Sequence, residues 1–188
     1  MKPVLFLAAL ILASNVVATV RADDCDPNPP GTEDGYRIGH YGAPVPDCAP
    51  GAPTIGRDEV RAAVAAGDAI FIDVTPIDGS DPDPFDGSWG DVGTHLSMPG
   101  ATWLPEVGRG KPEAWLEDYF RDNLDRLTAE KPGAQVVIFC SSNCWGSWNA
   151  AKRAAGWGYP DIRWYPAGVS EWSERELAPT DPVPVEVE

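Results

Sequence analysis

The chain contains 188 residues, of which 29 are acidic and 14 are lysine or arginine, so its formal net charge is −15 at neutral pH. A protein this acidic is a poor partner for nucleic acid or an anionic membrane surface, and electrostatic steering favours basic partners instead. The length fits a single domain once an N-terminal export segment is set aside.

Residues 1–22 have the pattern of a secretory signal peptide. Lys2 precedes the apolar run VLFLAALILASNVVATV, and the residues that follow this run are compatible with cleavage after Ala22. We therefore expect a periplasmic protein with no membrane segment after cleavage, in a compartment where disulfides persist. Cleavage removes Lys2 and Arg21 and no acidic residue, which leaves a mature net charge of −17.

Residues 23–56 are rich in Pro, Gly and Asp, which predicts an irregular N-terminal arm rather than a core element. The two cysteines of this arm, Cys25 and Cys48, enclose a sequence with little apolar periodicity. A disulfide between them would restrict the unfolded chain and contribute roughly 3 kcal/mol for a loop of this length. We expect this pair to be structural and independent of the other two cysteines.

From residue 57 to residue 177 the hydrophobic pattern becomes regular and predicts one α/β domain. Short apolar runs predict buried strands, and apolar residues at helical spacing predict helices. The expected strands are 69–74, 101–104, 135–139 and 162–165, and the expected helices are 58–66, 112–127, 145–155 and 168–177. This alternation indicates a parallel sheet flanked by helices, with ligands at the carboxyl ends of the strands. The acidic, Pro-rich residues 178–188 predict a flexible tail.

The stretch FCSSNCWGSW, residues 139–148, carries Cys140 and Cys144 between an expected strand and an expected helix. A c-type haem attachment site is excluded, because it needs His after the second cysteine and position 145 is Trp. A thioredoxin domain is disfavoured, because it places most of its fold after the motif and only 44 residues follow Cys144. A structural zinc site is disfavoured too, because the remaining candidate ligands are irregularly spaced; these are Cys25, Cys48, His40 and His95.

A loop between a strand and a helix suits a reactive sulfur. Backbone N–H groups can converge on one sulfur while the positive end of the following helix points at it, and both effects lower the thiol pKa below about 8.5. We expect Cys140 to occupy this position, with a cradle formed by the other loop residues, Ser141, Ser142, Asn143 and Trp145. An inert Cys140–Cys144 bridge is the alternative, although it would constrain few residues.

The order of these elements resembles a rhodanese-like domain over residues 57–177. IFIDV resembles the strand that opens the family's motif, HLSMPGATWLP resembles its His-x-Pro-Gly-Ala segment, and Cys140 opens the loop as in the family. CSSNCW, although three residues separate its cysteines, and GYRIGHYGAPVP are similar to the PQQ-dependent catabolism-associated CXXCW motif proteins. Those are exported proteins whose genes accompany quinoprotein alcohol dehydrogenases and c-type cytochromes.

The resemblance implies a persulfide on Cys140, no cofactor, and a PQQ-dependent dehydrogenase or c-type cytochrome as partner. Rhodanese loops commonly close with a basic residue, and Trp145 stands there instead, which predicts weak binding of anionic thiosulfate. Cys144 is placed to attack a persulfide on Cys140, expel sulfide and leave a disulfide. Two functions are therefore open. One is an enzyme for sulfane sulfur or disulfide exchange with catalytic Cys140 and Cys144, and the other is a non-catalytic module that docks on or matures a quinoprotein dehydrogenase or its cytochrome.

Three further expectations concern side chains outside the cysteine pair. His95 could act as a base, but in the matching family segment it more often serves as a turn and packing residue, and we favour that structural role. Trp89 and Trp145 are the tryptophans that we expect to line the cleft or a partner surface. The Asp residues within 78–91 fit no EF-hand spacing, so we expect no metal site.

Overall fold

The computed structural model describes residues 24–77, 81–90, 92, 95–173, 176–179 and 184–187. The signal peptide predicted for residues 1–22 lies outside this part of the chain.

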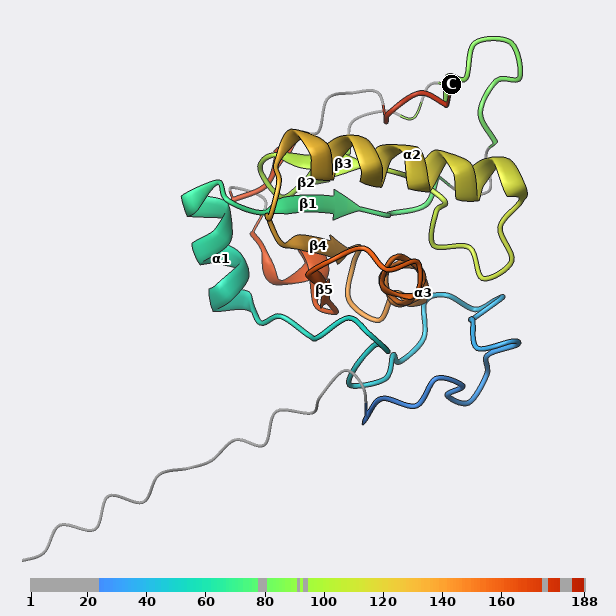
Figure 1. Ribbon diagram of the computed structural model, residues 1–188, viewed down its shortest axis with the longest axis horizontal. Helices are drawn as coiled ribbons and strands as arrows, with labels where there is room; N and C mark the ends of the chain where they lie inside the picture. Colours follow the sequence, from blue (N-terminus) through green and yellow to red (C-terminus); the bar gives the residue numbers. More distant parts are fainter. Residues whose placement is uncertain are drawn as a thin grey trace, which may run out of the picture.

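The centre of the domain is a four-stranded sheet in the order β3–β1–β4–β5, in which every neighbouring pair is parallel (Figure 1). These strands are β1 (Ile70–Asp73), β3 (Ala101–Trp103), β4 (Val136–Phe139) and β5 (Ile162–Tyr165), each within one residue of its predicted bounds. A separate antiparallel pair joins β2 (Leu96–Ser97) to β6 (Ala178–Pro179). The predicted fold class, an α/β protein with a parallel sheet flanked by helices, is confirmed.

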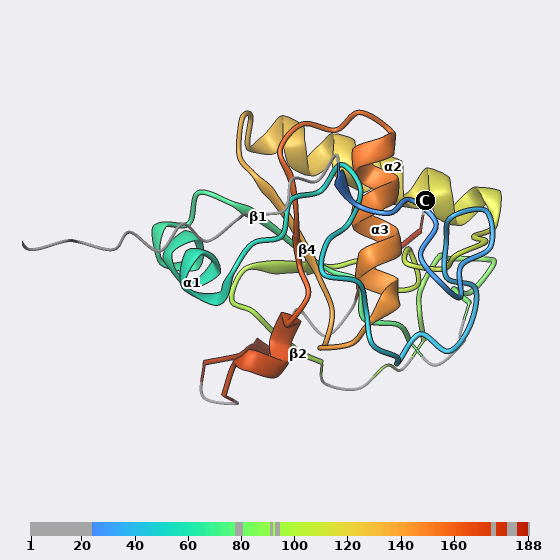
Figure 2. The same cartoon turned by 90° about the horizontal axis from the view of Figure 1, so that it is seen from below.

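Helices cover both faces of this sheet (Figures 1 and 2). The helices α2 (Ala114–Glu130) and α3 (Trp145–Gly156) share one hydrophobic core with the sheet. On the other face, α1 (Arg57–Ala66) and the 3-10 helix η2 (Gly168–Glu171) border a second, smaller core. The thiol loop therefore leaves the sheet between these two layers.

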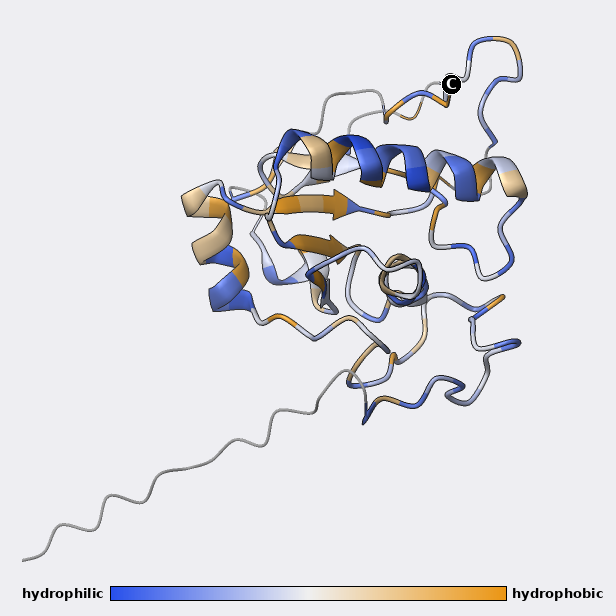
Figure 3. Ribbon diagram, viewed as in Figure 1, coloured by the Kyte–Doolittle hydropathy of each residue, from blue (hydrophilic) through white to orange (hydrophobic). Residues whose placement is uncertain are grey.

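Alternate residues of each strand supply the two cores. Ile70 and Ile72 face α2 and α3, whereas Phe71 faces α1. Figure 3 shows β1 and β4 as hydrophobic and the outer surface of α2 as hydrophilic, the pattern of a sheet buried on both faces. At the end of β1 this pattern gives way to Asp73, a carboxyl group with no exposed surface.

Two helices differ clearly from the prediction. α2 continues to Glu130, beyond the predicted end at residue 127, while its start and the last helix differ for local reasons. α2 begins at Ala114 rather than at residue 112, because Glu113 is its N-cap and has an extended backbone. The helix predicted over 168–177 is a 3-10 helix that ends at residue 171. The backbone N–H and the hydroxyl of Ser173 both donate to the Glu176 carboxylate, at 2.9 and 2.8 Å. Local side-chain bonds of this kind compete with helical hydrogen bonds.

The N-terminal arm packs along α3. Cys25 and Cys48 form a disulfide within the arm. The ammonium group of Lys152 in α3 donates to the carbonyls of Pro27 and Gly35, both at 2.6 Å. The arm predicted from composition is thus irregular in structure but held to the domain by specific hydrogen bonds.

The C-terminal residues 184–187 lie beside α2 and β3. The N–H of Val185 donates to the carbonyl of Trp103 at 3.3 Å, and the Val185 carbonyl accepts bonds from the Tyr119 hydroxyl and the Trp89 indole at 2.8 and 3.0 Å. This described part of the tail, for which we predict flexibility, is hydrogen-bonded to the domain. None of the helices within the described ranges combines the length and apolarity that crossing a bilayer requires.

Candidate thiol site

The thiol pair lies at the carboxyl end of the parallel sheet. Cys140 directly follows β4, and Cys144 is the N-cap residue of α3. Three residues separate them, so the spacing is Cys-x-x-x-Cys, one residue longer than the Cys-x-x-Cys of the motif that they resemble. Because Asp73 at the end of β1 pairs in register with Phe139, the residues that follow β1 lie beside Cys140.

Both cysteines are free thiols with little exposed surface, 2% for Cys140 and 8% for Cys144. The three loop residues between them are exposed. The 3-10 helix η2 fixes the loop, since the Val169 N–H donates to the Cys140 carbonyl and the Ser142 N–H donates to the Ser170 hydroxyl, both at 2.9 Å. The N–H of Ser142 therefore holds the loop in place and serves neither sulfur.

The first N–H groups of α3 act on Cys144. Hydrogen bonding with the Cys140 thiol, followed by the N–H groups of Ser147, Gly146 and Ser141, lowers the pKa of Cys144 to about 7. The Cys144 side chain makes no capping hydrogen bond, so the N–H groups of Gly146 and Ser147 act on it as oriented dipoles at the positive end of the helix. The expectation that the N–H groups of the helix converge on Cys140 is wrong: those of Ser147 and Gly146 act on Cys144, and only that of Ser141, in the loop, acts on both sulfurs.

Cys140 has a different environment. Its hydrogen bond with Cys144 and its burial raise the pKa of the Cys140 thiol. Its sulfur lies 3.7 Å from the hydroxyl of Thr75, and 3.9 Å from the hydroxyl of Ser141. The two thiols thus differ in the direction of their pKa shifts, which is the arrangement that separates an attacking thiol from a resolving one.

Behind Thr75 lies a cluster of buried polar groups. The Thr75 hydroxyl and N–H donate to Oδ1 of Asp73, at 2.6 and 2.9 Å. Oδ2 of Asp73 accepts from the Ser97 hydroxyl at 2.6 Å and lies 2.8 Å from Nε2 of His95. The His95 ring stacks on Trp103 with centroids 4.1 Å apart, as the packing role predicted for it requires.

Sequence reasoning missed Thr75 and Asp73 as site residues. A polar pair directly after the apolar run IFI was the available signal, because the carboxyl end of a parallel strand is where ligands and reactive groups gather.

Trp145 does not line a cradle around the sulfurs. Its backbone N–H donates to the carbonyl of Tyr41 at 2.9 Å and its indole N–H to the carbonyl of Pro44 at 3.0 Å. Its ring packs edge-on against Trp148 inside the larger core. Trp89 is equally buried, so the prediction that Trp89 and Trp145 line a cleft or partner surface is wrong. Trp145 instead ties the arm to the start of α3.

A small cavity of about 50 Å³ opens beside Cys144. Arg109 is the cation in its wall, and its guanidinium bonds the carboxylates of Glu106, Glu113 and Asp81 at 3.0, 3.1 and 3.1 Å. A guanidinium shared among three carboxylates has little positive potential left for an anionic ligand. The full lining comprises Tyr41, Val74, Pro76, Glu106, Gly108, Arg109, Cys144 and Gly146.

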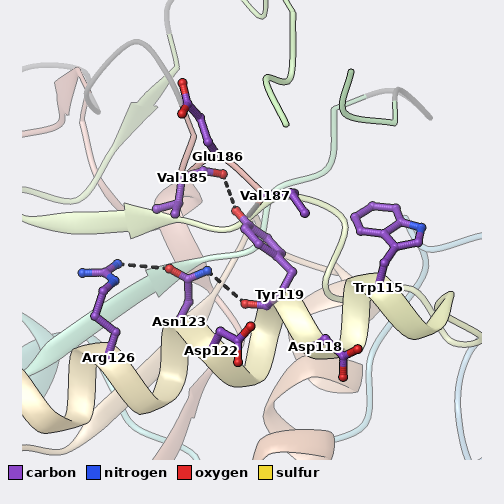
Figure 4. Close-up of a pocket in the computed structure, with 9 residues that line it drawn as sticks. All are labelled: Trp115, Asp118, Tyr119, Asp122, Asn123, Arg126, Val185, Glu186 and Val187. Carbon is purple, nitrogen blue, oxygen red and sulfur yellow. Dashed lines mark hydrogen bonds between the residues drawn. The ribbon is translucent and has the colours of Figure 1, made fainter. Parts of the chain in front are cut away.

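A larger hollow of about 370 Å³ lies between α2 and residues 185–187 (Figure 4). Its wall includes Trp115 and Tyr119, and neither Cys140 nor Cys144 lines it. Within the described ranges, no three His, Cys, Asp or Glu side chains are grouped so as to hold a metal ion. The two buried thiols are therefore the group of side chains with the clearest capacity for chemistry.

Comparisons with known proteins identify similar structures and a matching family. Two solved structures are similar: a human single-domain sulfurtransferase, TSTD1, at 27% identity, and the Tum1 protein from Saccharomyces cerevisiae, at 17%. Each match covers 66% of this chain; it covers 98% of TSTD1 and 46% of Tum1, and both TM-scores are 0.42. A search of curated protein sequences finds no match.

The family assignment rests on a sequence model rather than on those structures, whose TM-scores lie below 0.5. The model of the rhodanese-like domain matches residues 57–175, which is more than half of the chain and contains every element of the four-stranded sheet. The chain therefore belongs to the rhodanese-like domain family.

Proposed function

We propose that this chain is a thiol protein that handles sulfane sulfur or exchanges disulfides through Cys140 and Cys144. One observation carries the proposal: two buried free thiols, Cys140 directly after β4 and Cys144 at the N-cap of α3, lie at the two ends of one short loop at the carboxyl end of a rhodanese-like sheet. Their interaction shifts their pKa values in opposite directions. A thiol with a lowered pKa supplies the attacking thiolate, and its neighbour supplies the second sulfur that two-electron chemistry needs.

We assign the attack to Cys144 and the resolution to Cys140. Cys144 lines the small cavity and has the lowered pKa, whereas Cys140 is deeper and has the raised pKa. These roles are the reverse of those expected from the position of Cys140 at the start of the loop.

With a disulfide substrate, the reaction takes place in two steps. The Cys144 thiolate attacks one substrate sulfur and displaces the other as a thiolate. Cys140 then loses its proton, attacks Sγ of Cys144 and displaces the remaining substrate sulfur. The two cysteines lose two electrons, the substrate disulfide gains them, and the two thiol protons end on the released thiols. With a persulfide donor, the first step moves the outer sulfur to Cys144 and the second releases it as sulfide.

Thiosulfate is a less suitable donor. Residues 141–145 carry no charged side chain, and the nearby cation, Arg109, is already bonded to three carboxylates. The strongly acidic chain adds a repulsive field for any anion. Neutral disulfides and protein persulfides do not meet this barrier.

A redox titration of Cys140 and Cys144, read out by the mass shift on alkylation, tests the proposal. We expect reversible oxidation to a Cys140–Cys144 disulfide, with a midpoint in the range of about −120 to −270 mV that is typical of exchange proteins. A bridge that stays oxidised below about −300 mV would indicate a structural role. A pair of thiols that glutathione disulfide cannot oxidise would also contradict the proposed exchange activity.

The second candidate is a non-catalytic rhodanese-fold module that docks on or matures a quinoprotein dehydrogenase or its cytochrome. The burial of both thiols, together with the backbone bridge between Gly42 of the arm and Cys144, favours it. If the protein is such a docking module, a variant with Ser at both positions 140 and 144 keeps full biological activity. If the protein acts through its thiols, the same variant loses that activity.

We further propose that the protein is exported and assists PQQ-dependent alcohol oxidation. The signal-like residues 1–22, the Cys25–Cys48 disulfide and the likeness of CSSNCW to the CXXCW motif proteins support this setting. Fractionation of cells that express the full chain tests export. A deletion strain tests the setting: we expect slower growth on an alcohol and unchanged growth on an organic acid, and equal growth of deletion and parent strains on both would count against it.

A further inference from the structure

We infer that Asp73, acting through the hydroxyl of Thr75, is the base that takes the proton from the Cys140 thiol. This inference rests on the proposed function, because it concerns the step in which Cys140 resolves a bond on Cys144. It adds two residues to the site, neither of which is a cysteine.

The need for such a base follows from where Cys140 lies. Its side chain is buried, with 2% of the residue exposed, so water cannot readily collect its proton. The neighbouring Cys144 cannot take the proton during resolution, because its sulfur is then bonded to the substrate sulfur. Two hydroxyls lie near Sγ of Cys140: that of the exposed Ser141 at 3.9 Å, and that of Thr75 at 3.7 Å, which is the one bonded to a carboxylate.

The Thr75 hydroxyl makes that connection. Its oxygen lies 2.6 Å from Oδ1 of Asp73 and 3.7 Å from Sγ of Cys140. A hydroxyl has one proton to donate and two lone pairs to accept with. The shorter bond, to a carboxylate, takes the proton, which leaves a lone pair of the Thr75 oxygen for the S–H of Cys140. The order of donors is then Cys140, Thr75, Asp73.

Asp73 is held in a fixed position beside Thr75. It has no exposed surface, and four donors from three residues fix its two oxygens in place. These are the N–H and hydroxyl of Thr75 on Oδ1, and the Ser97 hydroxyl and His95 Nε2 on Oδ2. His95 has 17% of its side chain exposed and connects this cluster with solvent.

The step shifts two protons by one place each, with the net result that Cys140 loses a proton and Asp73 gains one. The Cys140 proton passes to the Thr75 oxygen as the original Thr75 proton passes to Oδ1 of Asp73. The result is a Cys140 thiolate that now accepts a hydrogen bond from Thr75, and a neutral Asp73. When the thiolate attacks Sγ of Cys144, the released substrate sulfur leaves with the electron pair, and the proton returns to solvent from the Asp73–His95 side. Thr75 and Asp73 are thus positioning and proton-transfer residues for Cys140.

The test compares Thr75→Val, which keeps the shape and removes the hydroxyl, with Thr75→Ser, which keeps the hydroxyl. Oxidised glutathione is the probe, and mass spectrometry of quenched samples follows the mixed disulfide on Cys144 and then the Cys140–Cys144 bridge. We expect Thr75→Val to slow the second step on the order of 100-fold and Thr75→Ser to stay within about threefold of wild type. Formation of the mixed disulfide should not change in either variant.

Thr128→Val is the matched control. It removes a hydroxyl that bonds within α2 to the Leu124 carbonyl at 2.7 Å, so it should leave both steps at the wild-type rate. Resolution in Thr75→Val at the wild-type rate would overturn the inference. Equal slowing in Thr75→Ser and Thr75→Val would also overturn it, because packing and not the hydroxyl would then be the cause.

A second measurement separates this inference from the proposed function. In a Cys144→Ser background, the ultraviolet absorbance of the Cys140 thiolate is titrated with and without Thr75→Val. This titration needs no substrate and no exchange activity. If the hydroxyl serves Cys140, its loss shifts the thiolate titration to higher pH by at least about one unit. Superimposable titrations would refute the role of Thr75 even where the wild-type pair exchanges disulfides, and a shift would support it even where the pair does not.

Discussion

The indole N–H of Trp148 donates a 2.9 Å hydrogen bond to the carbonyl of Cys48. Trp148 belongs to the helix that begins at Cys144, and it has no exposed surface. Cys48 belongs to the disulfide of the arm. The structural disulfide and the thiol pair are thus separate in chemistry but connected through one side chain of α3.

Replacement of both Cys25 and Cys48 by Ser should lower the free energy of unfolding by about 3 kcal/mol, because the bridge closes a loop with a sequence separation of 23 residues. Urea denaturation followed by tryptophan fluorescence measures this change. The wild-type protein with this bridge reduced serves as the control and should match the variant. An unchanged unfolding midpoint would show that the arm needs no cross-link. Peptide mapping should never find Cys25 or Cys48 linked to the thiol pair.

The rate of Cys144 alkylation should rise with pH through a midpoint near 7, below the value of about 8.5 for a free thiol. Cys144 ionises more readily because its thiolate accepts a hydrogen bond from Cys140 first, and then faces the N–H groups of α3. Cys140→Ala removes the first contribution and should raise the midpoint, whereas Cys140→Ser retains a donor and should raise it less. Iodoacetamide labelling across a pH series provides the measurement. An identical midpoint in the two variants would contradict the role given to the Cys140 donor.

Gly168→Ala should displace the thiol loop. Gly168 has φ +52°, and a methyl group there would overlap the carbonyl oxygen and carbon of Cys140. Gly158→Ala is the matched control, since Gly158 also has a positive φ, of +90°, but has open space around it. We expect a loss of about 1 kcal/mol for Gly158→Ala and of more than about 2 kcal/mol for Gly168→Ala. Only Gly168→Ala should also change thiol reactivity, and equal effects of the two variants on stability and labelling would refute this account.

Asn149→Ala should loosen the arm. The fully buried side chain of Asn149 accepts the Arg37 N–H at 3.1 Å and donates to the carbonyls of Arg37 and Gly108, each at 2.9 Å. Its removal leaves these backbone groups without that partner and should cost about 2–3 kcal/mol. Limited proteolysis should then cut within residues 26–47 faster. Asn123→Ala, whose lost bonds lie within α2, should leave the arm protected.

Thiosulfate:cyanide sulfurtransferase activity should be weak in the wild-type protein. Glu113→Gln removes one of the three carboxylates on Arg109 and should raise the activity a few-fold, on the scale of one surface ion pair. Asp118→Asn, at a position in the separate hollow along α2, removes one negative charge away from Arg109 and is the control for net charge. Rapid turnover of thiosulfate by the wild-type protein would show that the shared guanidinium still binds anions.

The sheet could be predicted from sequence because its strands are continuous apolar runs, as the agreement of β1 and β5 with their expected bounds shows. The thiol site could be predicted only in part. The position of Cys140 after a strand was predictable, but the donors that reach Cys144 depend on the N-cap geometry of α3, which the residue types alone do not determine. Trp145 was misjudged because a tryptophan beside a reactive loop has the same sequence signature whether it lines a cleft or anchors an arm. Thr75 could be placed beside Cys140 only when the register of β1 against β4 was known.

The backbone bridge between Gly42 and Cys144 connects the arm directly to one of the two thiol residues. A Cys140–Cys144 bond would constrain the Cys144 side chain, and the backbone N–H of the next residue, Trp145, donates to the carbonyl of Tyr41 in the arm at 2.9 Å. We therefore expect the arm to respond when the pair is oxidised. Ile38, a large apolar side chain that is 44% exposed, stands on that surface. A partner that touches the arm would be able to distinguish the reduced protein from the oxidised one without any contact with sulfur.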